Sequence, residues 1–178
     1  MVRPMQPDAH TGGKPHSNRT AARLAAVQAL YQMDMTQKDL NEVLAEFVVH
    51  RLEADPPPDA YRDADVEFFR SVVSGTVFHQ AEIDPIIAGS LAEGWRLSRI
   101  DSILRAILRA GVYEVILRPD VPARALINEY VDVAHSFFGG DEPAVVNGVL
   151  DRIAKSRRAD EMGADRAKNE RSKSKERG

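Results

Sequence analysis

Apolar residues recur at helical spacing along most of the chain, and no stretch shows the regular alternation that is typical of a β-strand. The run 100–116 is the clearest case, because its apolar side chains fall within one broad arc when residues are placed about 100° apart. These are Ile100, Ile103, Leu104, Ile107, Leu108, Gly111, Val112, Val115 and Ile116. An arc this broad indicates a helix that is surrounded by others, and we predict an all-α fold.

Capping residues and helix breakers divide the chain into about seven predicted helices. The first begins at Ser17 or Asn18 and runs to about residue 35, and the second covers about 39–52, before three consecutive prolines. The others are expected at about 63–80, at 85–93 with Asp84 as cap and Pro85 as first helical residue, at 98–118 with Ser98 as cap, at 122–138 after Asp120-Val121-Pro122, and at 141–157 with Asp141 as cap and Pro143 in the first turn.

Composition separates one folded domain from two tails. Residues 1–17 mix proline, glycine, histidine and serine without periodicity, which predicts a disordered N-terminal tail. Residues 157–178 are almost entirely charged or small, which predicts a charged, mobile C-terminal tail. The domain between them, 18–156, is long enough to bury a core.

The net charge of −3 hides a strong asymmetry. Residues 1–30 carry four basic residues and one acidic residue, and residues 152–178 carry ten basic and five acidic residues, so 31–151 carry a net charge of −11. Basic ends can meet phosphates while an acidic body repels them, which restricts where a polyanion can bind. Tails that only keep the chain in solution would give the same pattern, so charge alone assigns no ligand.

Several classes of function are disfavoured by what the sequence lacks. There is no cysteine, which excludes disulfides, thiolate metal sites and cysteine nucleophiles. There is no phosphate-binding glycine loop or nucleophile elbow, and the five histidines form no ligand pair at helical spacing. We therefore expect no catalytic residue, no metal site and no cofactor. No apolar run approaches the roughly 18 residues that span a bilayer, and the N-terminus lacks the apolar core of a signal peptide, so we expect a cytoplasmic protein without membrane contact.

One carboxylate lies inside the apolar arc of the central helix. Glu114 should be buried, and a buried carboxylate needs hydrogen-bond donors. The first turn of the next helix, with amides near Arg124 and Ala125, is one candidate donor and Asn128 is another. Because no second catalytic group accompanies Glu114, we favour a structural role over that of a general acid.

Two pairs of arginines are spaced four residues apart. Arg19 and Arg23 share a face of the first helix, and we expect them at its rim, where guanidinium groups can bind phosphates or stack on bases. Arg105 and Arg109 lie opposite the apolar arc, and we expect both to be solvated.

The segment Phe137–Pro143 places two aromatic residues before a glycine break and a helix start. We expect one phenylalanine in the core and the other as a stacking platform for a base. Asp141 and Glu142 occupy the helix N-terminus and would repel a phosphate, so RNA should contact this turn through bases or ribose hydroxyls.

Taken in order, several stretches resemble the NusB family of bacterial transcription antitermination factors. They are Ala22-Arg23, Ala26–Tyr31, Phe68-Phe69-Arg70 with Gly75, Leu108–Glu114, Asp120-Val121-Pro122, Ile127-Asn128-Glu129 and Val146–Asp151. The resemblance covers about residues 18–156. It implies two packed helical subdomains and a non-enzymatic protein that binds single-stranded boxA RNA of nascent ribosomal transcripts. It also implies a partner, the small-subunit ribosomal protein that doubles as NusE, and a role in RNA polymerase antitermination and termination.

The resemblance also implies site residues. The implied RNA contacts are Arg19, Arg23, Phe137, Asp141 and Val145, and the implied NusE contacts are Tyr31 and Asp101. Asn128 and the pair Asn147 and Gly148 are interpreted as structural, with glycine allowing close helix packing and asparagine bonding to nearby backbone. Relatives often have further arginines at Thr20 and Ala21, and a basic and an aromatic residue at Ala144 and Val145. The RNA site is therefore poorer here, and the protein partner should matter more.

Two alternatives stay open at this point. A NusB-like domain also precedes the catalytic domain of certain ribosomal RNA methyltransferases, so the chain is alternatively an enzyme fragment. It is also alternatively a helical scaffold that binds only protein, for example as a homodimer.

Overall fold

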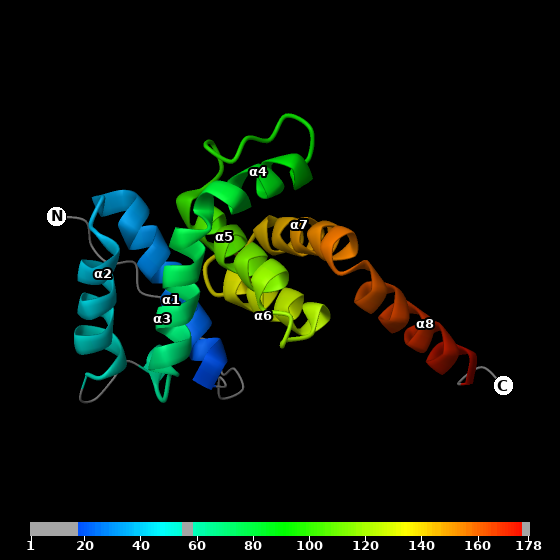
Figure 1. Ribbon diagram of the computed structural model, residues 1–178, viewed down its shortest axis with the longest axis horizontal. Helices are drawn as coiled ribbons and strands as arrows, with labels where there is room; N and C mark the ends of the chain where they lie inside the picture. Colours follow the sequence, from blue (N-terminus) through cyan, green and yellow to red (C-terminus); the bar gives the residue numbers. More distant parts are fainter. Residues whose placement is uncertain (1–17, 55–58, 176–178) are drawn as a thin grey trace.

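A computed structural model describes residues 18–54 and 59–175, and within these ranges the chain forms eight α-helices and no strand (Figure 1). The helices are α1 (Asn18–Thr36), α2 (Leu40–Phe47), α3 (Val66–Phe78), α4 (Gln80–Ser90), α5 (Ser102–Leu117), α6 (Ala123–His135), α7 (Glu142–Arg157) and α8 (Ala159–Lys175). A π-helical turn, Val48–Leu52, and a 3-10 turn, Asp59–Tyr61, connect α2 to α3. The predicted all-α class is confirmed. The predicted tail 1–17 lies outside the described residues.

The helices form two groups that share one core. α1, α2 and α3 lie together, while α4, α6 and α7 gather around α5 (Figure 1). Because α5 also contacts α1 and α3, it is the central element, and its side chains are buried on nearly every side. This confirms that the broad apolar arc of 100–116 marks a surrounded helix.

Two glycines permit close helix contacts in this core. A Cβ atom on Gly75 of α3 would overlap the ring of Tyr113 on α5. A Cβ atom on Gly111 of α5 would lie 3.0 Å from Leu150 of α7. The prediction that Gly148 serves this purpose is wrong, because Gly148 is exposed and a Cβ there would meet nothing within 4 Å.

The starts of two helices differ from the sequence prediction. α4 begins at Gln80, so Pro85 lies inside the helix, and Asp84 bonds to another helix instead of capping its own. α5 is capped by Asp101, whose Oδ1 accepts from the amides of the second and third helical residues at 2.7 and 3.2 Å. Ser98 is not the cap, because the chain from 96 to 100 turns first, with the carbonyl of Arg96 accepting two amides.

The segment predicted as a C-terminal tail contains the helix α8, which projects away from the other helices (Figure 1). Its first turns hold it to the domain. Met162 is buried, and the Glu161 carboxylate accepts from the Ala123 amide at the start of α6 and binds Arg158 on its other oxygen, both at 2.6 Å. One buried apolar side chain in a charged run is too weak a pattern for the sequence to reveal this packing. No helix in the described part of the chain is both long and apolar enough to cross a membrane.

Candidate nucleic-acid interface

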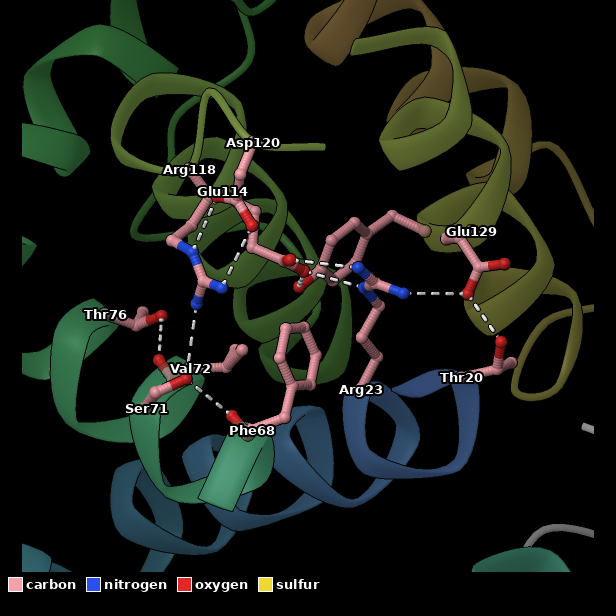
Figure 2. Close-up of polar contacts among 11 residues, drawn as sticks. Thr20, Arg23, Phe68, Ser71, Val72, Thr76, Glu114, Arg118, Asp120 and Glu129 are labelled. Carbon is pink, nitrogen blue, oxygen red and sulfur yellow. Dashed lines mark hydrogen bonds and ion pairs between the residues drawn. The ribbon is translucent and has the colours of Figure 1, made fainter. Parts of the chain in front are cut away.

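A buried ion pair joins α1 to α5. Arg23 donates from Nε to Glu114 Oε2 at 2.8 Å and from Nη2 to Oε1 at 3.0 Å (Figure 2). Only 4% of the Arg23 side chain and none of Glu114 is exposed. The Tyr130 hydroxyl donates a third bond to the same carboxylate at 2.6 Å. Glu114 is thus buried as predicted, and all three donor atoms are on side chains.

The predicted donors to Glu114 are wrong. Arg124, Ala125 and Asn128 are all exposed on α6. They lie on its outer face, whereas Tyr130 lies on the face that packs against the core. Asn147, whose side chain was expected to bond to nearby backbone, is likewise exposed.

The network continues from the core to the surface. Arg23 Nη1 binds Glu129 Oε2 at 3.1 Å, and the Thr20 hydroxyl donates to the same oxygen at 2.7 Å (Figure 2). Glu129 is 30% exposed. The N-terminal turn of α1 therefore touches the middle of α6.

Protonation in this network is fixed by its surroundings. Burial opposes the charge of Arg23, but the hydrogen bonds and charge of Glu114 outweigh it and raise the pKa of Arg23 above its already high ordinary value. Burial, together with the charge of Glu114, raises the pKa of Tyr130 well above its ordinary value. The phenol thus keeps its proton and stays a donor.

Three guanidinium groups surround one aromatic ring. The Cζ atoms of Arg19, Arg23 and Arg118 lie 4.8, 4.9 and 5.5 Å from the centroid of Phe68. Cations within about 6 Å of an aromatic ring are attracted to its face. Phe68 is buried at the start of α3, Arg23 is buried, and Arg19 is exposed. The ring of Phe68 thus contacts the exposed, positively charged Arg19 at the N-terminal end of α1.

The expectation that Arg19 and Arg23 both lie at an exposed rim is therefore wrong for Arg23. Residues four apart on a helix share a face, but they need not share a depth. Arg23 lies where α5 and α6 cover α1, and Arg19 lies one turn beyond that cover.

Arg105 and Arg109 are also not solvated. Arg105 binds Asp34 of α1 at 2.8 and 3.0 Å, and Arg109 binds Asp84 of α4 through two contacts of 2.8 Å. Arg109 also reaches Asp34 at 3.4 Å. These pairs tie α1 and α4 to α5, so the arginines serve the fold.

The other predicted RNA residues lie between the end of α6 and the first turn of α7. Phe137 and Phe138 are both half-buried and pack against the core, so the expected division into a core ring and a free platform is wrong. Val145 is also half-buried. Asp141 is exposed at the N-cap of α7, and its side chain makes no capping bond.

The residues assigned to a protein partner lie at one end of the α1–α5 pair. α1 and α5 are antiparallel, because Arg23 meets Glu114 while Asp34 meets Arg105. Tyr31, near the end of α1, and Asp101, before the start of α5, are therefore brought to the same end. Tyr31 is half-buried and Asp101 is exposed.

The sequence did not single out Phe68 and Arg118 as site residues. They are about 50 residues apart and meet only because α3 packs on α5. Within residues 18–54 and 59–175, no group of three or more acidic or histidine side chains is arranged to hold a metal ion.

Comparison with known proteins identifies the family. The sequence model of the NusB family matches residues 20–155. The chain belongs to the NusB family. A transcription antitermination protein NusB from Rhodopseudomonas palustris is 54% identical over 151 residues, which cover 85% of this chain and 89% of that protein. These relatives are antitermination proteins matched over nearly their whole length, so the expectation of a non-enzymatic antitermination factor is confirmed.

Solved structures of NusB proteins share the fold. NusB from T. maritima superposes with a TM-score of 0.65 at 28% identity, covering 80% of this chain and 93% of that chain. A structure of antitermination factors NusB and NusE in complex with dsRNA gives a TM-score of 0.60 at 30% identity, covering 78% of this chain and 97% of that chain. A homologue is thus known together with both NusE and RNA.

Proposed function

We propose that this protein binds single-stranded boxA RNA of nascent ribosomal transcripts together with NusE. In this way it helps RNA polymerase, in the cytoplasm, to pass termination signals. The observation that carries the proposal is the likeness to the chain found in complex with NusE and dsRNA. The exposed positive charge of Arg19, which lies against the Phe68 ring, supports it, because contacts with phosphates supply much of the affinity of an RNA complex.

The proposed RNA surface begins at Arg19. With Arg23 held by Glu114, Arg19 is the member of the pair whose side chain is exposed. We include the segment Phe137–Val145, which joins α6 to the first turn of α7, because α1 also contacts α6. Asp141 there favours contact with bases or ribose hydroxyls over phosphates.

The proposed NusE surface lies at the opposite end of α1, at Tyr31 and Asp101. Twelve residues of helix separate Arg19 from Tyr31, a span of about 18 Å at 1.5 Å per residue. NusE can then bind without displacing RNA at Arg19. Asp101 is exposed and caps α5 through Oδ1, so its Oδ2 is available to accept a hydrogen bond from NusE.

A gel-shift titration of the full chain tests the function. A boxA-like RNA should bind more tightly than a scrambled RNA of the same composition, and NusE should tighten the boxA complex. Specific protein–DNA complexes are about a thousandfold or more tighter than nonspecific ones, and a far smaller ratio is measurable by this titration. Equal affinity for both RNAs, with and without NusE, would contradict the proposal. Sedimentation of the same samples distinguishes a homodimer that ignores RNA.

Arg19→Glu should weaken binding of both RNAs by a similar factor, because a phosphate contact carries no sequence information. The slope of log affinity against log salt concentration should fall by about one. Arg152→Glu on α7, an exposed arginine that bonds to the Ser90 carbonyl, is the matched control. Arg19→Glu indistinguishable from Arg152→Glu would show that α1 does not contact the phosphate. Arg23 is not a useful target here, since Arg23→Glu would face Glu114 in the core.

A further inference from the structure

Besides Arg19, Arg118 also places a guanidinium group that solvent can reach against the ring of Phe68. It is the C-cap residue of α5, and its side chain is 22% exposed. Its Cζ lies 5.5 Å from the Phe68 centroid, and that of Arg19 lies 4.8 Å from it. Arg19 and Arg118 thus lie against the same aromatic ring, and the charges of both act on the carboxylate of Asp120.

In the structure, the carboxylate of Asp120 binds the guanidinium group of Arg118. Arg118 donates from Nε to Oδ1 at 3.1 Å and from Nη2 to Oδ2 at 3.4 Å, a two-pronged contact (Figure 2). The hydrogen bonds from Arg118 lower the pKa of Asp120, and the charges of Arg118 and Arg19 act in the same direction. The positive charges of both arginines therefore stabilise the Asp120 carboxylate, which is ionised at neutral pH.

The contact with Asp120 is of a kind that a phosphate can replace. A guanidinium group binds a carboxylate and a phosphate with the same forked geometry. Asp120 is 53% exposed, and exposed ion pairs contribute little to stability, so exchange is easy. The adjoining backbone stays in place, because Arg158 donates to the carbonyls of Pro119 and Val121 on either side of Asp120.

We propose that Arg19 and Arg118, supported by Phe68, bind one phosphate group of single-stranded RNA, and that Asp120 occupies the fork of Arg118 until the phosphate displaces it. This inference rests on the proposed RNA-binding function. Asp120 remains beside the bound phosphate and repels it, so it lowers the affinity for every RNA sequence alike.

RNA titrations of Asp120→Asn and Arg118→Gln test this in the full chain, with the boxA-like and scrambled RNAs as probes. Asp120→Asn should tighten binding of both RNAs by roughly threefold to tenfold. Arg118→Gln should weaken both by a similar factor and lower the salt slope by about one. Arg118→Lys should keep the salt slope but regain only part of the affinity, because lysine has the charge without the planar fork.

Matched controls remove the effect of net charge. Glu42→Gln, in the first turn of α2 and in an exposed pair with Lys38, carries the charge change of Asp120→Asn. Arg152→Gln carries that of Arg118→Gln. Circular dichroism establishes that each variant is folded.

The outcomes separate this inference from the proposed function. If the unaltered protein binds RNA but Asp120→Asn and Arg118→Gln match their controls, the phosphate site is overturned and RNA binding stands. If Asp120→Asn tightens only the boxA-like RNA, the site contacts a base and the phosphate assignment is wrong. If neither RNA binds the unaltered protein, both proposals fail.

Discussion

Arg23→Met should lower the free energy of unfolding by about 3–5 kcal/mol, because it leaves the Glu114 carboxylate buried without its opposite charge. Methionine keeps much of the volume of the arginine stem, so the loss reports the charge more than a cavity. Urea unfolding followed by helical circular dichroism measures it. The Tyr130 hydroxyl still donates to Glu114, but one neutral bond does not replace a two-pronged ionic contact.

The double variant Arg23→Met with Glu114→Leu should recover most of this loss, since it removes both charges from the core together. Lys155→Met on α7 is the control, because its pair with Asp151 is exposed and i,i+4 pairs contribute about 0.5 kcal/mol or less. If Arg23→Met is no more destabilising than Lys155→Met, the buried pair does not stabilise the packing of α1 on α5.

Gly75→Ala should destabilise the protein by about 1–3 kcal/mol, because the added Cβ overlaps the ring of Tyr113 and forces α3 away from α5. The same substitution at Gly89 should have the opposite sign. A Cβ on Gly89 of α4 meets nothing within 4 Å, and alanine is favoured over glycine inside a helix by about 0.5–1 kcal/mol. Urea unfolding of both variants measures the difference, and a stabilised Gly75→Ala protein would refute the close α3–α5 contact.

The helices could be predicted because their apolar periodicity and local caps lie within a few residues of each other. α7 begins directly after Asp141 and ends at Arg157, as predicted, although the Asp141 side chain makes no capping bond. The prediction failed where a distant group takes over a local signal. Asp84 has the sequence of a cap, but its carboxylate binds Arg109 on another helix. α8 depends on Glu161 reaching the amide of Ala123, which is 38 residues away.

The site was less predictable than the fold, for the same reason. Periodicity placed Glu114 in the core correctly, but which side chains reach it depends on how α1 and α6 approach α5. Arg23 is 91 residues from Glu114, and no local pattern links them. Spacing also placed Arg19 and Arg23 on one face without revealing that one is buried. In the sequence, Phe68 looks like any other apolar core residue. Only the packed structure shows that arginines lie against its ring.

The ion pairs between α1 and α5 encode the direction in which the two helices run past each other. α1 carries its cation, Arg23, at one end and its anion, Asp34, at the other, and α5 carries Glu114 and Arg105 in the complementary order. Were α1 turned end for end, Arg23 would face Arg105 and Asp34 would face Glu114, with like charges confined in a poorly solvated contact. These four charged side chains therefore favour the antiparallel arrangement of α1 and α5 over the parallel one.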